Sequence, residues 1–275
     1  MKTPSELEND VLDFLSELHK LRKALDIPPE NILNFDEMAL YYDQIPAYTY
    51  DKKGTGHPLL KLSKLQKKRL TVGLTITSSG EKLRPLLIFK GKGSRINKLS
   101  NFNDYFVRKN ENAWNTNKIF LEYLHQIVKP FILGQKQKEE FKDKKVLLIM
   151  DNFSAHKIED EKMKELEEFG LMIRNLKPYT INICQPLDLN INYLVKSQMK
   201  EAWMNWFGIN SNVNPTKQII YSWFVKAFKG ITPLSIIKAF LMSGISNELD
   251  GTSDILCPNL VTLRKKEKKQ QMSME

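Results

Sequence analysis

The chain contains only two cysteines, Cys184 and Cys257, in 275 residues. Two isolated cysteines supply neither a disulfide framework nor a metal-binding cluster of thiolates, which indicates a reducing compartment. The N-terminus lacks the apolar core of a signal peptide, and no apolar run approaches the length of a membrane-spanning helix. We therefore expect a soluble, intracellular protein with no membrane partner.

Acidic residues are fewer than basic ones, with 32 Asp and Glu against 42 Lys and Arg and a formal net charge of +10. This excess favours a polyanionic partner such as nucleic acid, because Lys and Arg release counterions from phosphates. Charge alone does not decide the matter, since many basic proteins bind no nucleic acid. The hydrophobic fraction of 41% is sufficient for a packed core and argues against a disordered chain.

The succession of apolar patterns predicts an α/β fold with a mixed central sheet. Alternating apolar residues and threonines predict a half-buried strand over 70–77, which forms a hairpin with the next strand. The predicted strands are 32–35, 70–77, 83–89, 146–150 and 171–176. The predicted helices are 5–25, 120–131, 159–169, 187–207 and most of 221–249. The basic tail 264–269 is expected to be disordered.

Three aspartates occupy the ends of these predicted elements. Asp36 ends the first strand, Asp151 ends the strand 146–150, and Asp188 begins the long helix. A carboxylate at the end of a buried strand needs compensation, because a lone buried charge is costly. Hard oxygen ligands that converge from several elements are what two-metal phosphoryl transfer requires. The pattern therefore predicts a Mg²⁺ site, although each aspartate alone is also typical of a simple turn or strand end.

Several basic residues allow two interpretations. Lys68 and Arg69 close a stretch without acids that is either a solvated face or a contact to the DNA backbone. The other basic residues of that stretch are Lys61, Lys64 and Lys67. Lys196 lies two helical turns beyond Asp188 and either reaches a phosphate or has no specific role. The basic tail is either a nuclear-import signal or a solubilising end.

The segments around the aspartates resemble the DDE superfamily of transposase endonucleases, in the pogo/Tigger/jerky branch of the Tc1/mariner group. The matching segments are NFDEM at 34–38, KRLTV at 68–72, GEKLRPLLIFKG at 80–91, LLIMDNFSAH at 147–156, QPLD at 185–188 and AFLMSGI at 239–245. They occur in order at suitable spacings, and the resemblance covers roughly residues 10–250. One departure is Pro178, which stands where the family usually has a pair of prolines.

The resemblance implies an RNase H-like fold with a mixed central sheet flanked by helices, plus a C-terminal helical extension. It divides the chain into an N-terminal helix and linker (1–30), a catalytic core (31–207) and the extension with its basic tail (208–275). It maps a catalytic metal triad onto Asp36, Asp151 and Asp188, with Mg²⁺ as cofactor and Mn²⁺ as a substitute. Asn152 and His156 match family positions beside the second aspartate, where they orient the loop or contact phosphate.

The same resemblance implies DNA as the partner, in the form of transposon ends and target, with a homo-oligomer assembled on DNA in the nucleus. Such transposases usually carry an N-terminal helix-turn-helix region, and we expect this chain to begin too late to contain one. Two alternatives stay open. One is a domesticated DNA-binding or chromatin protein without catalysis, as in centromere-protein-B-like and jerky-like descendants. The other is an unrelated RNase H-like nuclease that acts on RNA–DNA hybrids.

Overall fold

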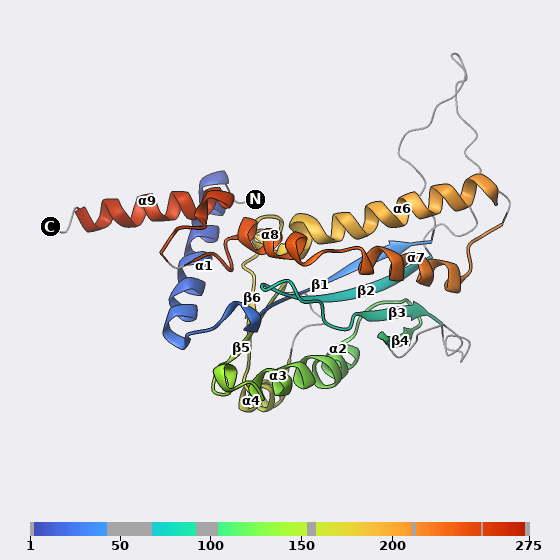
Figure 1. Ribbon diagram of the computed structural model, residues 1–275, viewed down its shortest axis with the longest axis horizontal. Coiled ribbons are helices and arrows are strands. Elements are labelled where there is room, and N and C mark those ends of the chain that lie inside the picture. The colour runs from blue at the N-terminus through green and yellow to red at the C-terminus, as the bar shows by residue number, and fades with distance from the viewer. Residues whose placement is uncertain are drawn as a thin grey trace, which may run out of the picture.

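One mixed β-sheet organises the part of the chain that the structure describes (Figure 1). The computed structural model describes residues 3–42, 68–91, 104–152, 158–210, 213–248 and 250–272. In these residues six strands form a sheet in the order β4-β3-β2-β1-β5-β6. The strands are β1 (Ile32–Tyr41), β2 (Arg69–Thr77), β3 (Leu86–Lys90), β4 (Phe106–Asn110), β5 (Val146–Met150) and β6 (Leu171–Asn175). Strand β1 runs antiparallel to β2 and parallel to β5, so the predicted mixed sheet is confirmed.

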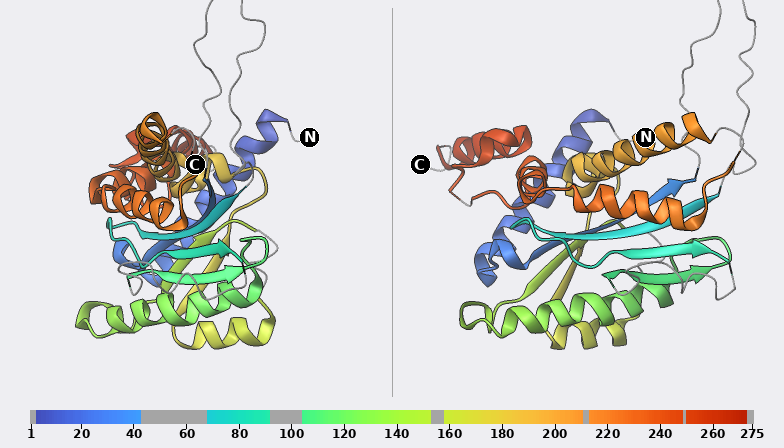
Figure 2. Two further views of the ribbon diagram at one scale, coloured as in Figure 1. Left: turned by 90° about the vertical axis from the view of Figure 1, so that its right-hand side faces the viewer. Right: turned by 45° about the vertical axis from the view of Figure 1, so that its right-hand side comes forward.

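Helices cover both faces of the sheet (Figure 2). One face is covered by α2 (Asn117–Tyr123), the π-helical turn η4 (Leu124–Val128), α3 (Lys129–Lys136) and α4 (Asp160–Glu168). The opposite face is covered by the π-helical turn η7 (Leu187–Ile191), α6 (Asn192–Ile209), α7 (Lys217–Lys229) and α8 (Pro233–Ser243). The short elements are η1 (Pro29–Asn31), η5 (Glu139–Phe141), α5 (Ile181–Cys184) and η8 (Asp254–Leu256). Within the described residues, every helix is too short or too polar to cross a membrane.

The two terminal helices pack on each other beside the sheet. Helix α1 (Pro4–Leu25) begins at a capping box in which Thr3 and Glu6 bond each other's backbone amides. Its apolar side enters the same hydrophobic cluster as α6 to α8 and α9 (Pro258–Met272). The boundaries drawn at residues 30 and 207 stay a prediction about the chain's organisation.

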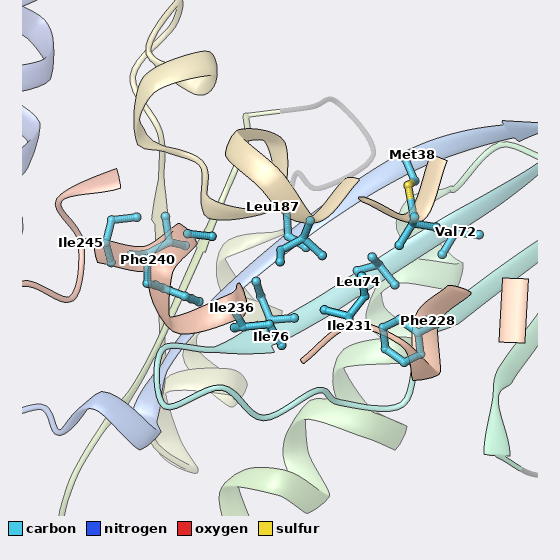
Figure 3. Packing of buried hydrophobic residues seen from close by; sticks show 14 of the residues in the cluster. Met38, Val72, Leu74, Ile76, Leu187, Phe228, Ile231, Ile236, Phe240 and Ile245 are labelled. Atoms are coloured by element: carbon cyan, nitrogen blue, oxygen red, sulfur yellow. The ribbon is translucent and has the colours of Figure 1, made fainter. Parts of the chain in front are cut away.

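Leu187 anchors the segment that carries the third aspartate (Figure 3). Its fully buried side chain lies against Ile236 of α8 and Ile76 of β2 in the cluster that also contains Met38 and Leu74. Burial of a leucine side chain stabilises a fold by about 1.5–3 kcal/mol, which fixes η7 against the sheet. The residue that follows Leu187 is therefore held close to β1.

Strand β1 extends further than the sequence indicated. The expectation that Asp36 ends this strand is wrong, because β1 continues to Tyr41. The strand continues since β2 pairs with it along its whole length, from Leu33 opposite Thr77 to Tyr41 opposite Arg69. Asp36 is therefore a mid-strand residue, held by antiparallel pairing on one side.

Two further expectations are wrong. Strand β4 lies in a segment predicted as a loop, since only its first two residues, Phe106 and Val107, are buried and the rest is polar. The tail predicted as disordered continues helix α9 to Met272. Leu260 and Leu263 anchor the start of that helix in the core, and Lys, Glu and Gln are good helix formers that carry it onward.

Candidate active site

The parallel pairing of β1 with β5 ends at Asn34 and Ile149, and the sheet edge beyond this pair carries Asp36 and Asp151, although β1 itself continues to Tyr41. Asn34 pairs with Ile149 in the parallel register. Two residues further on, Asp36 and Asp151 occupy matching positions, and the period of two directs both side chains to the same face. Asp36 is only 8% exposed. Asp151 is half-buried, directly after β5.

Asn34 joins the elements of the site. Its side-chain nitrogen donates to the carbonyl of Ile149 at 2.9 Å, and its side-chain oxygen accepts from the backbone N–H of Leu187 at 3.0 Å. The residue is fully buried, so both bonds form away from water. A single amide thus ties β1 to β5 and to the start of η7, where Asp188 lies.

Asp188 meets Asp36 through Asn192. The side-chain nitrogen of Asn192 donates to Asp36 Oδ2 at 2.6 Å and to Asp188 Oδ1 at 3.0 Å. Gln185 donates to the other oxygen of Asp188 at 3.0 Å. Two carboxylates from distant parts of the sequence therefore approach one nitrogen atom, and Asp188 is oriented on both of its oxygens.

Burial raises the pKa of Asp36 from its ordinary value of 3.8 to about 7. The negative charge of Asp188 contributes to this rise, the hydrogen bonds from Asn192 and from the backbone of Glu37 oppose it, and Asp151 adds a smaller effect. An acid loses its proton less readily when burial and like charges disfavour the ionised form. A cation beside Asp36 and Asp188 would reverse this balance.

The side-chain oxygen atoms at this edge are of the type that binds a hard cation. Asp36 and Asp188 supply carboxylate oxygens, which are the ligands that Mg²⁺ prefers. Within the described chain, the buried side-chain oxygen of Asn192 has no hydrogen-bond partner, so a neutral oxygen is also available there. However, no three acidic, histidine or cysteine side chains among the described residues converge as a ready metal site. Asp36 and Asp188 lie close together as a pair. Asp151 lies at the same edge, but the three carboxylates do not converge on one position.

The other predicted site residues lie around this edge. Asn152 is exposed and lines a cavity of about 520 Å³ with Asp151 and Tyr179. Lys68 is exposed before β2. Lys196 is exposed on α6. His156, Lys61, Lys64 and Lys67 lie outside the described residues.

Arg69 is held beside an aromatic ring. Its guanidinium carbon lies 5.0 Å from the centre of the Trp114 ring, and both residues line one cavity with Asp151. The cation therefore lies near the acidic edge, at the start of β2, in the stretch predicted either to be solvated or to contact DNA.

Three amides that organise the site were not assigned a role from the sequence. Asn192 lies four residues after Asp188, a spacing that brings side chains together on a helix. Gln185 lies three residues before Asp188, in the extended backbone that precedes η7. Asn34 precedes Asp36 by two residues, a spacing that places both on one face of a strand. These spacings were available in the sequence, but amides at such positions have many other uses.

The sequence of this chain matches a protein-family model over more than half of its length. The model of the DDE superfamily endonuclease family matches residues 67–240, which include Asp151 and Asp188 and begin after Asp36. The chain belongs to the DDE superfamily of endonucleases. The predicted family is thereby confirmed.

Curated relatives of this chain lie in the predicted pogo branch. Human "Pogo transposable element with KRAB domain" is 20% identical over 261 residues, covering 92% of this chain and 41% of the relative. "CENP-B homolog protein 2" of Schizosaccharomyces pombe is 26% identical over 231 residues, covering 79% and 42%. Mouse "Tigger transposable element-derived protein 4" is 29% identical over 143 residues, covering 52% and 26%. The chain spans less than half the length of these relatives.

Solved structures confirm the predicted fold of this chain. The Mos1 strand transfer complex matches with a TM-score of 0.53 at 10% identity, covering 89% of this chain and 60% of that chain. The mariner Mos1 paired end complex with Mg matches with a TM-score of 0.50 at 11% identity, covering 92% and 63%. At this identity the likeness establishes the RNase H-like fold alone.

Proposed function

We propose that this chain is the catalytic core of a transposase-type DNA endonuclease and strand transferase. Asp36, Asp151 and Asp188 hold divalent cations in this proposal, with Mg²⁺ as the cofactor and Mn²⁺ as a substitute. The observation that carries it is the pairing of Asp36 and Asp188 on the nitrogen of Asn192, at the sheet edge where β5 delivers Asp151. Like-charged carboxylates kept together without a basic residue between them are typical of a cation site.

The residues of the chain divide the work in this proposal. Asp36 needs to lose its proton to act as a ligand, and its raised pKa of about 7 makes that loss depend on the cation. Gln185 and Asn192 keep both oxygens of Asp188 in fixed directions. When bound, Mg²⁺ supplies charge stabilisation for in-line phosphoryl transfer. Asn152, His156, Lys68, Arg69 and Lys196 are proposed contacts to DNA or to the loop after Asp151.

DNA is the proposed partner because the similar Mos1 structures are named as a strand transfer complex and a paired end complex. Transposon ends and target DNA would meet on a homo-oligomer of the chain. The formal charge of +10 supports a polyanionic partner. A DNA-acting role implies the nucleus as the location.

A second candidate function is DNA binding without catalysis. The observation that favours it is that no three acidic side chains among the described residues close on a common point. Similarity to "CENP-B homolog protein 2" agrees with either function. The two candidates differ in whether the carboxylates bind metal, so metal titration separates them.

Nicking of supercoiled DNA in the presence of Mg²⁺ or Mn²⁺ tests the first candidate. Asp151→Ala is expected to abolish nicking, because removal of a metal-holding carboxylate removes the charge that stabilises the reacting phosphate. Glu168→Gln, an exposed charge at the end of α4, is the matched control and is expected to nick like the wild type. Equal nicking by Asp151→Ala would refute the assignment. Calorimetric titration that shows no metal-dependent heat in the wild type, together with retained DNA binding, would favour the second candidate.

A further inference from the structure

A cavity adjoins the acidic edge on the side of β1 and β2. Its volume is about 310 Å³, which is at the lower end of the range for ligand pockets, about 300–1,000 Å³. Its lining includes Arg69, Trp114, Asn115, Glu37 and Asp151. Asp151 also belongs to the proposed catalytic set, so a group held in this cavity lies beside the reacting phosphate.

Trp114 is an exposed aromatic residue in a tightly held turn. Its side chain is 53% exposed, which is unusual for a residue that normally contributes large apolar area to a core. The side chain of Asn110 donates to the backbone carbonyl of Trp114 at 2.8 Å. Thr71 of β2 donates to the carbonyl of Ala113, which has a left-handed φ of 56°. The exposed indole is therefore carried by a turn whose backbone is held by hydrogen bonds.

The next residue secures the same turn to β1. Asn115 donates from its side chain to Glu37 at 2.6 Å, and its side-chain oxygen accepts from the backbone N–H of Thr116 at 2.9 Å. Thr116 in turn caps helix α2. A platform that is ordered before its ligand arrives loses little conformational entropy on binding, which favours affinity.

Arg69 adds a cation at the ring. Its guanidinium lies 5.0 Å from the centre of the Trp114 ring, and exposed Lys68 precedes it. A planar guanidinium pairs with phosphate oxygens, while an aromatic face stacks on a base. Single-stranded nucleic acid is bound by this combination, in which cations follow the backbone and aromatic side chains stack on bases.

We propose that this cavity binds one unpaired nucleobase of the DNA substrate, stacked on Trp114, with Arg69 on the adjoining phosphate. This inference rests on the proposed function and adds to it an unpaired nucleotide next to the cleavage site. The occupant is a single base, since the small cavity and its shared residue Asp151 suit one nucleotide continuous with the reacting strand. A protein segment bound at Trp114 is the rival outcome of the test.

The experiment compares two short single-stranded oligonucleotides that differ only in one base, which is replaced by an abasic site in the second. Binding is measured by fluorescence anisotropy without divalent metal, so that no strand is cut. The wild type is expected to bind the complete oligonucleotide about tenfold more tightly, in line with the usual effect of stacking one base on an aromatic residue. Trp114→Leu is expected to remove this preference, and Trp114→Phe to keep most of it.

Phe141→Leu is the matched control. Phe141 also has a cation beside its ring, with Lys138 at 5.4 Å, but it lies in η5 before β5, away from the edge where Asp36 and Asp151 lie. This variant is expected to keep the base preference of the wild type. Arg69→Ala is expected to weaken binding of both oligonucleotides equally and to lower the salt dependence, because it removes a phosphate contact.

The outcomes separate the two proposals. A base preference that Trp114→Leu leaves unchanged, with nicking intact in the wild type, overturns the stacking site and leaves the proposed function standing. A wild type without base preference also overturns the stacking site. A wild type that binds neither oligonucleotide and nicks no DNA overturns both. Photocrosslinking of a bromouracil-containing strand to Trp114, mapped by mass spectrometry, would support the site directly.

Discussion

Asp36 and Lys82 are both partly or fully buried charged residues, but their neighbours differ in sign: those of Asp36 disfavour its charge, and those of Lys82 favour its charge. Asp36 is surrounded by charges of its own sign, and its pKa is raised. Lys82 donates to the carbonyls of Phe228 and Ile231, both at 2.8 Å, at the C-terminal end of α7, where the helix dipole favours a cation. Both residues belong to segments that resemble the family. A segment that matches the family therefore contributes either to the site or to its support, and the charges around its polar residue distinguish the two.

The largest expected effect is a dependence of stability on pH that comes from Asp36. Below its ordinary pKa of 3.8 the residue is protonated in both states, and between 3.8 and about 7 only the folded state retains the proton. Folding stability therefore falls as pH rises through this window, by about 2–3 kcal/mol between pH 5 and pH 8 for this group in metal-free protein. Urea titrations at several pH values measure it, with Asp36→Asn expected to abolish this contribution. A contribution of equal size in Asp36→Asn would contradict the explanation.

A smaller effect is expected from Asn192→Leu, which removes the amide between the two carboxylates. Divalent cation affinity is expected to fall by about 10–100-fold, as for other residues that orient metal ligands. Calorimetric titration with Mn²⁺ measures the loss, and Asn192→Gln tests whether a longer amide restores part of it. Asn210→Leu, a substitution just after α6, provides the control for a lost amide away from the site. Unchanged affinity in Asn192→Leu would show that the amide does not position the carboxylates.

The smallest effect is expected from Lys82→Met, which keeps an unbranched side chain, one atom shorter, but removes its charge. The free energy of unfolding is expected to fall by about 1–2 kcal/mol, because carbonyl groups at the end of α7 lose their donor. Metal affinity is expected to stay at the wild-type value. Chemical denaturation and calorimetry on the same samples measure both quantities. A loss of metal affinity without a loss of stability would reverse the distinction between Lys82 and Asp36.

The sequence predicted the strands that precede two of the aspartates better than it predicted the contacts between these strands. The apolar runs before Asp36 and Asp151 were sufficient to predict a strand before each aspartate, because short buried runs are a local property. The full length of β1 was not predictable in the same way, since residues up to Tyr41 are held by pairing with a distant strand. The bonds of Asn34 to Ile149 and Leu187 depend on three segments that meet only in the folded chain.

Resemblance carried information of a different kind. It identified QPLD as the third acidic position, and the structure brings Asp188 to Asp36. It did not distinguish Gly80 and Lys82, which support α7 and α8, from residues of the site. Gly80 has a φ of +98°, and a Cβ there would lie 2.9 Å from Pro233, so this position serves packing. Family motifs thus locate important positions without distinguishing residues of the active site from residues that stabilise the fold.

The π-helical turn η7 has a mechanical consequence. The backbone N–H of Asn192 bonds to the carbonyl of Leu187, five residues back, where an ordinary α-helix would use Asp188. Such a turn holds one residue more than an α-helical turn, so it can absorb a change of phase between the segments on either side. Leu187 stays fixed in the core, while α6 is anchored independently through Val195 and Met199. The carboxylate of Asp188 can therefore point toward the sheet edge without a rotation of helix α6.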